Sequence, residues 1–444
     1  MNKLITFFFI SLLIICQSLY GDVVLGKLSD ASWVSAGGND MVLSFWTVPV
    51  TPWELEVVIE APDVSFNITP TAAVALKIDW GDGSESNYTG STIVHHTYTN
   101  ADTYTVALSG SATKLVFGND VATRGRLKRI LTKLDGVSDL TTFFQSFYLC
   151  ANLNWVPESL FENAEGVTTF EQLFRNSGVT NLPDLVFANN SEITTFRNTL
   201  ADCAKLATVS SNIFSGCPKV ASFHATFAYN YLFNGPPIGL FDDNTNVTSF
   251  YATFADNHGL GFTNLPASLF AKCTKVTSFG STFHGCKYVK ELPPTLFNNN
   301  TAATSFIQTF RNCWALVTVP SGLFTNNLNV TSFSGAFYTD YGLKNIETNV
   351  FPNSNKAIDF SICFYNCTSL TNVPSTLFDG CTNMSKTIGL FQGCAAIVSD
   401  VPELWDTAKF GNATLAVEAN HLNTFTGCIN AGNYADIPDA WKGL

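Results

Sequence analysis

Val276-Thr-Ser-Phe-Gly-Ser-Thr-Phe-His-Gly-Cys286 is one copy of a pattern that fills most of the 444-residue chain. The full unit is V-T-S-F-x-x-x-F-x-x-C-x-x-L-x-x-V-P-x-x-L-F followed by five or six polar residues, and it recurs from about residue 137. Its first phenylalanine returns every 26 to 29 residues, at Phe143, Phe170, Phe196, Phe223, Phe250, Phe279, Phe306, Phe333 and Phe360. A fixed period of this length is typical of stacked repeats, which bury their apolar sides only against their neighbours.

Two further phenylalanine columns accompany the first. The second column stands four residues later, at Phe147, Phe174, Phe227, Phe254, Phe283, Phe310, Phe337 and Phe364, with Leu200 in one repeat. The third column consists of Phe161, Phe187, Phe214, Phe241, Phe270, Phe297, Phe324, Phe351 and Phe378. With Phe391 and Phe425, these columns hold 28 of the 38 phenylalanines, so we expect phenylalanine to serve the stacking of the repeats.

The spacing within a unit predicts a short helix or 3₁₀ turn, a short strand and a polar turn. Phe-x-x-x-Phe has the i, i+4 spacing of one helical face. The Thr-Ser before it predicts a helix N-cap, because a hydroxyl can accept a free backbone N–H. Leu-x-x-Val-Pro predicts a short strand that proline ends. The resulting fold class is an α/β solenoid of about eleven coils of about 27 residues, with its strands in a parallel sheet.

These units resemble the leucine-rich repeats of BspA-like proteins, of the bacterial surface protein 26-residue type. Val276–Cys286 and Phe360-x-x-x-Phe364-Tyr-Asn-Cys367-Thr-Ser-Leu370 carry the resemblance best. It implies a leucine-rich-repeat-type solenoid over residues 137–399 and a surface protein that attaches to host components or to other cells. Residues 400–444 are irregular, which predicts C-terminal repeats and a cap.

Residues 22–119 do not share the repeat and predict a small all-β, immunoglobulin-like sandwich. Trp53–Ile59, Val74–Trp80 and Thr103–Leu108 alternate as strands do, and Gly81-Asp-Gly83 predicts a turn. Residues 120–136 are expected to be a linker and first-coil cap. They contain the one basic cluster, Arg124–Arg129, which we interpret as solvated, with polyanion binding as the alternative.

This N-terminal region resembles the polycystic-kidney-disease (PKD) domain, an extracellular module. The resemblance lies in Ile78-Asp-Trp-Gly-Asp-Gly-Ser84, His96-Thr-Tyr98 and Tyr104-Thr-Val106, and covers about 90 residues. It implies a role as a spacer or weak binding module.

Four residues of this domain invite a metal-site interpretation. Asp79 and Asp82 could bind calcium, but we favour turn capping by their carboxylates. His95 and His96 are adjacent on an expected strand and face opposite sides, so a structural His96 is the better interpretation.

Residues 1–21 predict a secretory signal peptide. Met1-Asn-Lys3 is followed by the apolar run Leu4–Ile15 and then by small residues up to Gly21. Ile15 is not small, which disfavours lipidation of Cys16. No later segment is long and apolar enough to span a membrane, so we expect a secreted or cell-surface location. The net charge of −12 argues against a nucleic-acid partner.

Cysteines and histidines are the remaining candidates for chemistry. Seven cysteines share the position three after the second phenylalanine, which predicts a buried ladder of thiols, with some disulfides as the alternative. Cys217, Cys273 and Cys381 form a looser second column. Histidines fall at unlike repeat positions, so no shared patch is expected of His224, His258, His284 and His421.

The sequence therefore predicts no catalytic, cofactor-binding or metal-ligating residues, and no cofactor. The favoured function is binding or adhesion outside the cell, with a host or cell-surface protein or glycan as partner. A carbohydrate-binding or carbohydrate-active protein and a structural envelope component remain alternatives. A ladder of threonines two residues before the first phenylalanine could bind sugar or ice, but helix capping explains it more simply.

Overall fold

The computed structural model describes residues 32–35, 41–44, 51–118, 120–121, 123–158, 160–162, 164, 166–406, 415 and 417–444. The chain forms two compact units, Met1–Pro52 and Trp53–Leu444. In the first unit, β1 (Ser32–Ser35) pairs antiparallel with β2 (Met41–Ser44). The signal peptide expected at residues 1–21 lies outside the described residues, as does much of the stretch from 22 to 50.

The second unit begins with two sheets. One sheet has the order β10-β3-β8-β5-β6, with β11 paired parallel to β8, and the other has the order β7-β4-β9. Their bounds are β3 Trp53–Ile59, β4 Val64–Thr71, β5 Ala73–Asp79, β6 Glu85–Gly90, β7 Val94–Tyr98, β8 Asp102–Ser111, β9 Lys114–Val116, β10 Leu127–Ile130 and β11 Val137–Ser138. The three strands expected from alternation therefore correspond to β3, β5 and β8.

The core of these sheets continues into the repeats. Trp53 on β3 is fully buried, and its ring lies 5.6 Å from that of Phe117. Phe117 stacks in turn on Phe147 of the second phenylalanine column, at 5.4 Å. Backbone pairing joins the same regions, because β10 and β11 both add to the sheet that contains β3 and β8.

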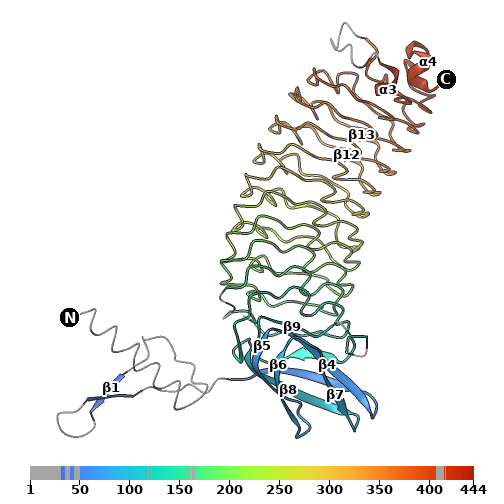
Figure 1. The fold of residues 1–444 in the computed structure, drawn as a ribbon. Coiled ribbons are helices and arrows are strands. Elements are labelled where there is room, and N and C mark those ends of the chain that lie inside the picture. Colours follow the sequence, from blue (N-terminus) through green and yellow to red (C-terminus); the bar gives the residue numbers. More distant parts are fainter. Residues whose placement is uncertain are drawn as a thin grey trace. The chain divides into compact units, whose positions relative to one another are not determined.

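Each repeat is a layer of turns, and Figure 1 shows these layers stacked on one another. From Phe279 to Gly285, every second N–H donates to a carbonyl of the next repeat, including Phe279 to Ser305, Ser281 to Ile307 and Phe283 to Thr309. The N–H groups between them close turns within the repeat, such as Thr282 to Phe279 and His284 to Ser281. The two neighbouring repeats thus share a row of backbone hydrogen bonds.

The predicted leucine-rich-repeat-type α/β solenoid is wrong. The described residues are mostly strands, turns and loops, and their only two α-helices, α3 (Glu418–His421) and α4 (Asp439–Lys442), are four residues long and follow the repeats. The helix expected from Phe-x-x-x-Phe does not form because Ser281 and Gly285 have φ of 53° and 70°. These left-handed values are incompatible with a right-handed α-helix.

The strand expected before proline is present in part. Thr318–Val319 (β12) and Asn345–Ile346 (β13) pair parallel, and other repeats have only single bridges here, such as Asn264 with Glu291. A second line of parallel bridges runs through the residue before the first-column phenylalanines from Phe170 to Phe360, including Ser278 with Ser305. The sheets along the repeats are therefore short and open.

The phenylalanine columns form the core, as the sequence predicts. Phe279 is fully buried and stacks on Phe250 and Phe306 at ring-centroid distances of 6.0 and 5.3 Å. Phe297 of the third column packs between the first-column rings, 4.7 Å from Phe279.

The stack ends in the irregular segment after residue 400. The 3₁₀ turn η2 (Tyr434–Asp436) precedes α4, and the N–H of Phe425 donates to the carbonyl of Trp441. Trp441 also stacks on the buried His421 at 4.1 Å. No helix in the described part of the chain is long and apolar enough to cross a membrane.

A candidate binding surface on the central repeats

The inward polar columns hold neighbouring repeats together. Thr282, three residues after the first phenylalanine, is buried and donates its hydroxyl to the carbonyl of Phe250 at 3.0 Å. Cys286 does the same from the thiol column, donating its Sγ to Phe254 at 3.0 Å. In the repeat where Asn230 replaces cysteine, its amide donates to Leu200 at 2.8 Å. These columns are explained by folding.

All eleven cysteines from Cys150 to Cys428 are free and buried, which confirms the predicted ladder of thiols. Burial raises the pKa of Cys150, Cys203 and Cys217 to about 12, so these groups stay protonated near neutral pH. A protonated buried thiol is a weak nucleophile and a poor metal ligand. The thiol column is therefore structural.

The threonine ladder two residues before the first phenylalanine does not cap helices. Thr277 donates its hydroxyl to the carbonyl of Thr248 at 3.2 Å, and Thr304 donates to Thr277 at 3.1 Å. The residue that accepts a backbone N–H is the next one, Ser278, whose Oγ receives the N–H of Gly280. The helix-cap interpretation is wrong, because the hydroxyls join successive repeats.

The aspartates of the N-terminal sheets cap turns, as predicted. Asp79 accepts the N–H of Gly81, and Asp82 accepts both the N–H and the hydroxyl of Ser84. His96 lies 2.8 Å from the other Asp82 oxygen and stacks on Trp80 at 4.7 Å. The described residues contain no group of three or more His, Cys, Asp or Glu that could hold a metal ion.

The outward columns are less regular, and their change in the central repeats creates a hollow. Five residues after the first phenylalanine, most repeats carry a large side chain, at Tyr148, Arg175, His284, Arg311, Tyr338, Tyr365 and Gln392. Three successive repeats carry Ala201, Ala228 and Ala255 instead. Two residues after the first phenylalanine, the glutamines at 145, 172 and 308 are likewise replaced by Ala225 and Ala252.

Four of these alanines, those at 225, 228, 252 and 255, line a hollow with a volume of about 420 Å³. Ala225, Ala228 and Ala255 pack together with Ala252 as its floor. We call this site the alanine hollow; it is also lined by Arg175, Asn198, His224, Tyr229, Tyr251, Asp256, Ser281, His284 and Gln308.

Aromatic side chains make the walls of the alanine hollow. Tyr229 and Tyr251 are 43% and 44% exposed, so much of each ring is available to a ligand. The ring of His224 lies 5.0 Å from that of Tyr251. Tyrosine supplies both an apolar face and a hydroxyl, a combination that suits recognition sites.

The hollow is lined by few charged groups, one of which is in an ion pair. Arg175 donates its Nε to Asp202 at 3.0 Å. Burial lowers the pKa of His224, and burial also lowers the pKa of His284 against the opposing effect of Asp256. Both imidazoles are therefore neutral near pH 7, and the charged side chains that line the hollow are Arg175 and Asp256.

The hollow corrects one expectation about the histidines. His224 and His284 occupy unlike repeat positions, yet both line this site. The position of each histidine within its repeat did not predict this proximity, because side chains from adjacent columns line the same hollow. The sequence feature that indicates the hollow is the replacement of large residues by alanine in two columns of the same repeats.

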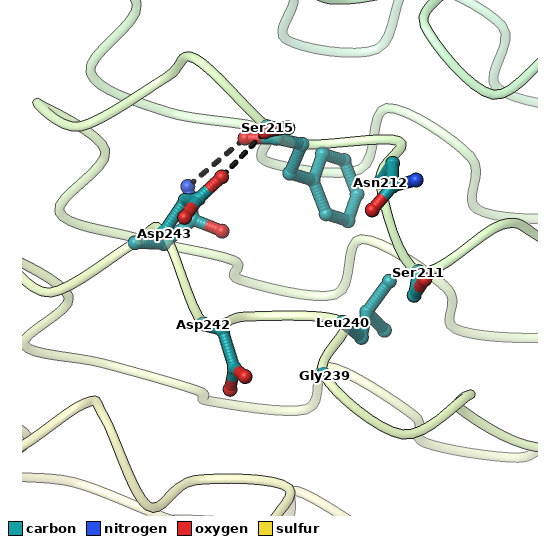
Figure 2. Close-up of a pocket in the computed structure, with 9 residues that line it drawn as sticks. Ser211, Asn212, Ser215, Gly239, Leu240, Asp242 and Asp243 are labelled. Carbon is teal, nitrogen blue, oxygen red and sulfur yellow. Dashed lines mark hydrogen bonds between the residues drawn. The ribbon is translucent and has the colours of Figure 1, made fainter.

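A smaller hollow of about 240 Å³ lies beside the third phenylalanine column (Figure 2). The hydroxyl of Ser215 donates to the carboxylate of Asp243, while Asp242 points away from this pair. Asn244 donates to the carbonyls of Phe214 and Cys217. These contacts join neighbouring repeats, so we assign this hollow a structural role.

No protein-family model matches the chain, and no curated protein matches it significantly.

Proposed function

We propose that the chain is an extracellular recognition protein whose central repeats bind a partner at the alanine hollow. The partner class is a host or cell-surface protein or glycan. The predicted signal peptide at residues 1–21 and the resemblance to BspA-like surface proteins support a location outside the cell.

One observation carries the proposal: Ala228 and Ala255 stand where other repeats have large side chains. The stack tolerates tyrosine, arginine or glutamine at this position, so folding does not require alanine there. The resulting concave site, with tyrosine walls and a few polar groups, has the features of a ligand-binding pocket.

Binding, rather than catalysis, suits the side chains of the hollow. Ser281, His284 and Asp256 all line it, but within residues 166–406 no hydrogen bond joins their side chains. A hydrolytic nucleophile requires a base within hydrogen-bonding reach and a group that orients the base.

The test is to fill the hollow with side chains that the stack already accepts. Ala225→Gln copies Gln172 and Gln308, which share its left-handed backbone with φ of 57° and 54°. Ala228→Arg copies Arg175 and Arg311 in its own column. The double variant should keep the wild-type thermal unfolding midpoint and lose binding to ligands found on protein and glycan arrays.

The matched control is Ala395→Arg, which adds the same large cation at an exposed alanine of a distant repeat. The control should bind as wild type does. Equal binding by the hollow-filled variant, or no array ligand for the wild type, would overturn the proposal.

A further inference from the structure

A second outward column changes character in the central repeats. The residue that follows the thiol column is small in most outer repeats of the stack, at Ala151, Gly178, Ala204, Thr368 and Ala395, and is Ile429 in the last unit. In the five successive repeats between them it is Tyr231, His258, Lys287, Trp314 and Tyr341. We call these five residues the aromatic strip.

Side chains of the strip contact each other in three of its four successive pairs. The rings of Tyr231 and His258 lie 5.4 Å apart, and those of Trp314 and Tyr341 lie 5.9 Å apart. Between these pairs, Lys287 places its Nζ 4.4 Å from the centre of the Trp314 ring. The five residues therefore form one row rather than separate surface groups.

The strip is accessible to a ligand. Tyr231, Trp314 and Tyr341 are 51%, 43% and 42% exposed, which leaves large aromatic surfaces open to a partner. Folding does not require an aromatic ring there, because the same column carries alanine, glycine or threonine in five other repeats and Ile429 in the last one. Clustered exposed apolar surface of this kind marks an interaction site.

We propose that the aromatic strip binds an extended glycan chain. The C–H faces of pyranose rings stack on aromatic rings, and their hydroxyls remain free to bond with water or neighbouring polar groups. Five repeats at the ~4.8 Å spacing of paired strands make a row about 19 Å long, which suits several consecutive sugars. Successive sugar units of a repeating glycan can therefore contact successive side chains of the strip.

The charge of the protein disfavours nucleic acid as the ligand of the strip. A net charge of −12 with one lysine in the strip disfavours nucleic acid, which also stacks on aromatic rings but needs clustered cations. Tyr229 of the alanine hollow is two residues from Tyr231, so the strip and the hollow meet in this repeat. The inference rests on the proposed recognition function and names a ligand class for it.

Affinity electrophoresis of the full secreted chain tests the proposal. The gels contain soluble xylan, galactomannan, hydroxyethylcellulose or polygalacturonate, and retardation measures binding. The strip variant combines Tyr231→Ala, Trp314→Ala and Tyr341→Ala, which restore the alanine found at 204 and 395. The control is Trp155→Ala, which removes a ring that is 40% exposed and lies outside the strip.

We expect at least one glycan to retard the wild type and the control equally, and the strip variant to bind at least tenfold more weakly. If the triple variant unfolds, the single variant Trp314→Ala replaces it, and we expect a smaller but measurable loss of glycan affinity. Retardation that survives loss of the strip overturns the proposal, and so does a wild type that none of the four glycans retards.

The hollow-filled variant separates this proposal from the general function. If no glycan binds but a protein ligand is lost on filling the hollow, the strip proposal fails and the recognition function stands. If the strip variant alone loses a glycan, the strip is a binding site whether or not the hollow has a ligand.

Discussion

The Asp340 carboxylate accepts the backbone N–H of Cys313 at 2.7 Å inside the stack, where both residues are fully buried. Asp340 occupies the thiol column, and its second oxygen, Oδ2, has no hydrogen-bond partner within residues 166–406. Burial raises the pKa of this carboxyl well above its ordinary value, against the effect of the Cys313 N–H. The stack therefore favours the protonated acid.

Asp340→Asn should stabilise the protein at neutral pH by roughly 1–3 kcal/mol, the cost of an unsatisfied buried polar group. Asn257 shows the expected geometry, since its Oδ1 accepts the N–H of Asn230 while its amide donates to Phe254. Urea unfolding at pH 7 measures the difference. An unchanged or lower free energy of unfolding would contradict the buried-acid interpretation.

The pH dependence of the wild type follows from the same shift. A folded pKa above the unfolded value means that the folded state binds more protons, so this contribution to stability is complete below about pH 4. It is then lost as the pH rises through the raised folded pKa. Asp340→Asn should remove this loss. Unfolding curves at successive pH values would then show a smaller difference in the free energy of unfolding between acid and neutral solution than in the wild type.

Ser281→Gly distinguishes the left-handed turn from a helix. At a φ of 53°, glycine relieves strain, so the free energy of unfolding should stay the same or rise by up to about 1 kcal/mol. In a helix the same change would cost up to about 1 kcal/mol. The control is Ser361→Gly. Ser361 directly follows Phe360 of the first column and does not have a positive φ, so glycine there should destabilise the protein.

The eleven thiols from Cys150 to Cys428 should resist alkylation in the native protein. Each is buried away from the reagent, and burial raises the pKa of Cys150 and Cys203, which keeps the reactive thiolate scarce at these two positions. Iodoacetamide labelling followed by site-resolved mass spectrometry should find these positions unmodified in buffer and fully modified in guanidinium chloride with no reductant. Sites that become reactive only after reduction would instead reveal disulfides.

Phe279→Ala should cost about 3–5 kcal/mol, because it leaves a cavity between rings that Phe250, Phe297 and Phe306 cannot close. Tyr341→Ala removes an equally large but exposed ring and should cost far less. Chemical unfolding of the two variants provides the comparison. Similar losses for both would contradict the division into a phenylalanine core and an outward strip.

The sequence predicted what lies inside the repeats better than how the backbone runs. Phenylalanine and cysteine columns were correctly assigned to the interior, because exact recurrence shows which positions neighbouring repeats share. The i, i+4 spacing of Phe279 and Phe283 also fits a helix, and only the backbone reveals the left-handed residue between them. Hydrophobic spacing cannot distinguish a helix from such a turn, because both place the two phenylalanines on the same side of the backbone.

The candidate surface was missed for a different reason. Residues that recur predict the interior of the repeats, whereas the hollow arises where Ala228 and Ala255 depart from their column and the strip arises where Tyr231 and Trp314 depart from theirs. Departures from the repeat are visible in the sequence. Their meaning depends on knowing which columns face outward and which of them are adjacent.

The most direct measurement of the central claim is array binding by one combined variant, with its thermal unfolding midpoint recorded on the same sample. The variant carries Ala225→Gln, Ala228→Arg, Tyr231→Ala, Trp314→Ala and Tyr341→Ala, which give the central repeats residues used elsewhere in the same columns. The account predicts a folded protein with a midpoint near that of the wild type and no binding to the wild-type ligands. A folded variant that retains those ligands would contradict it.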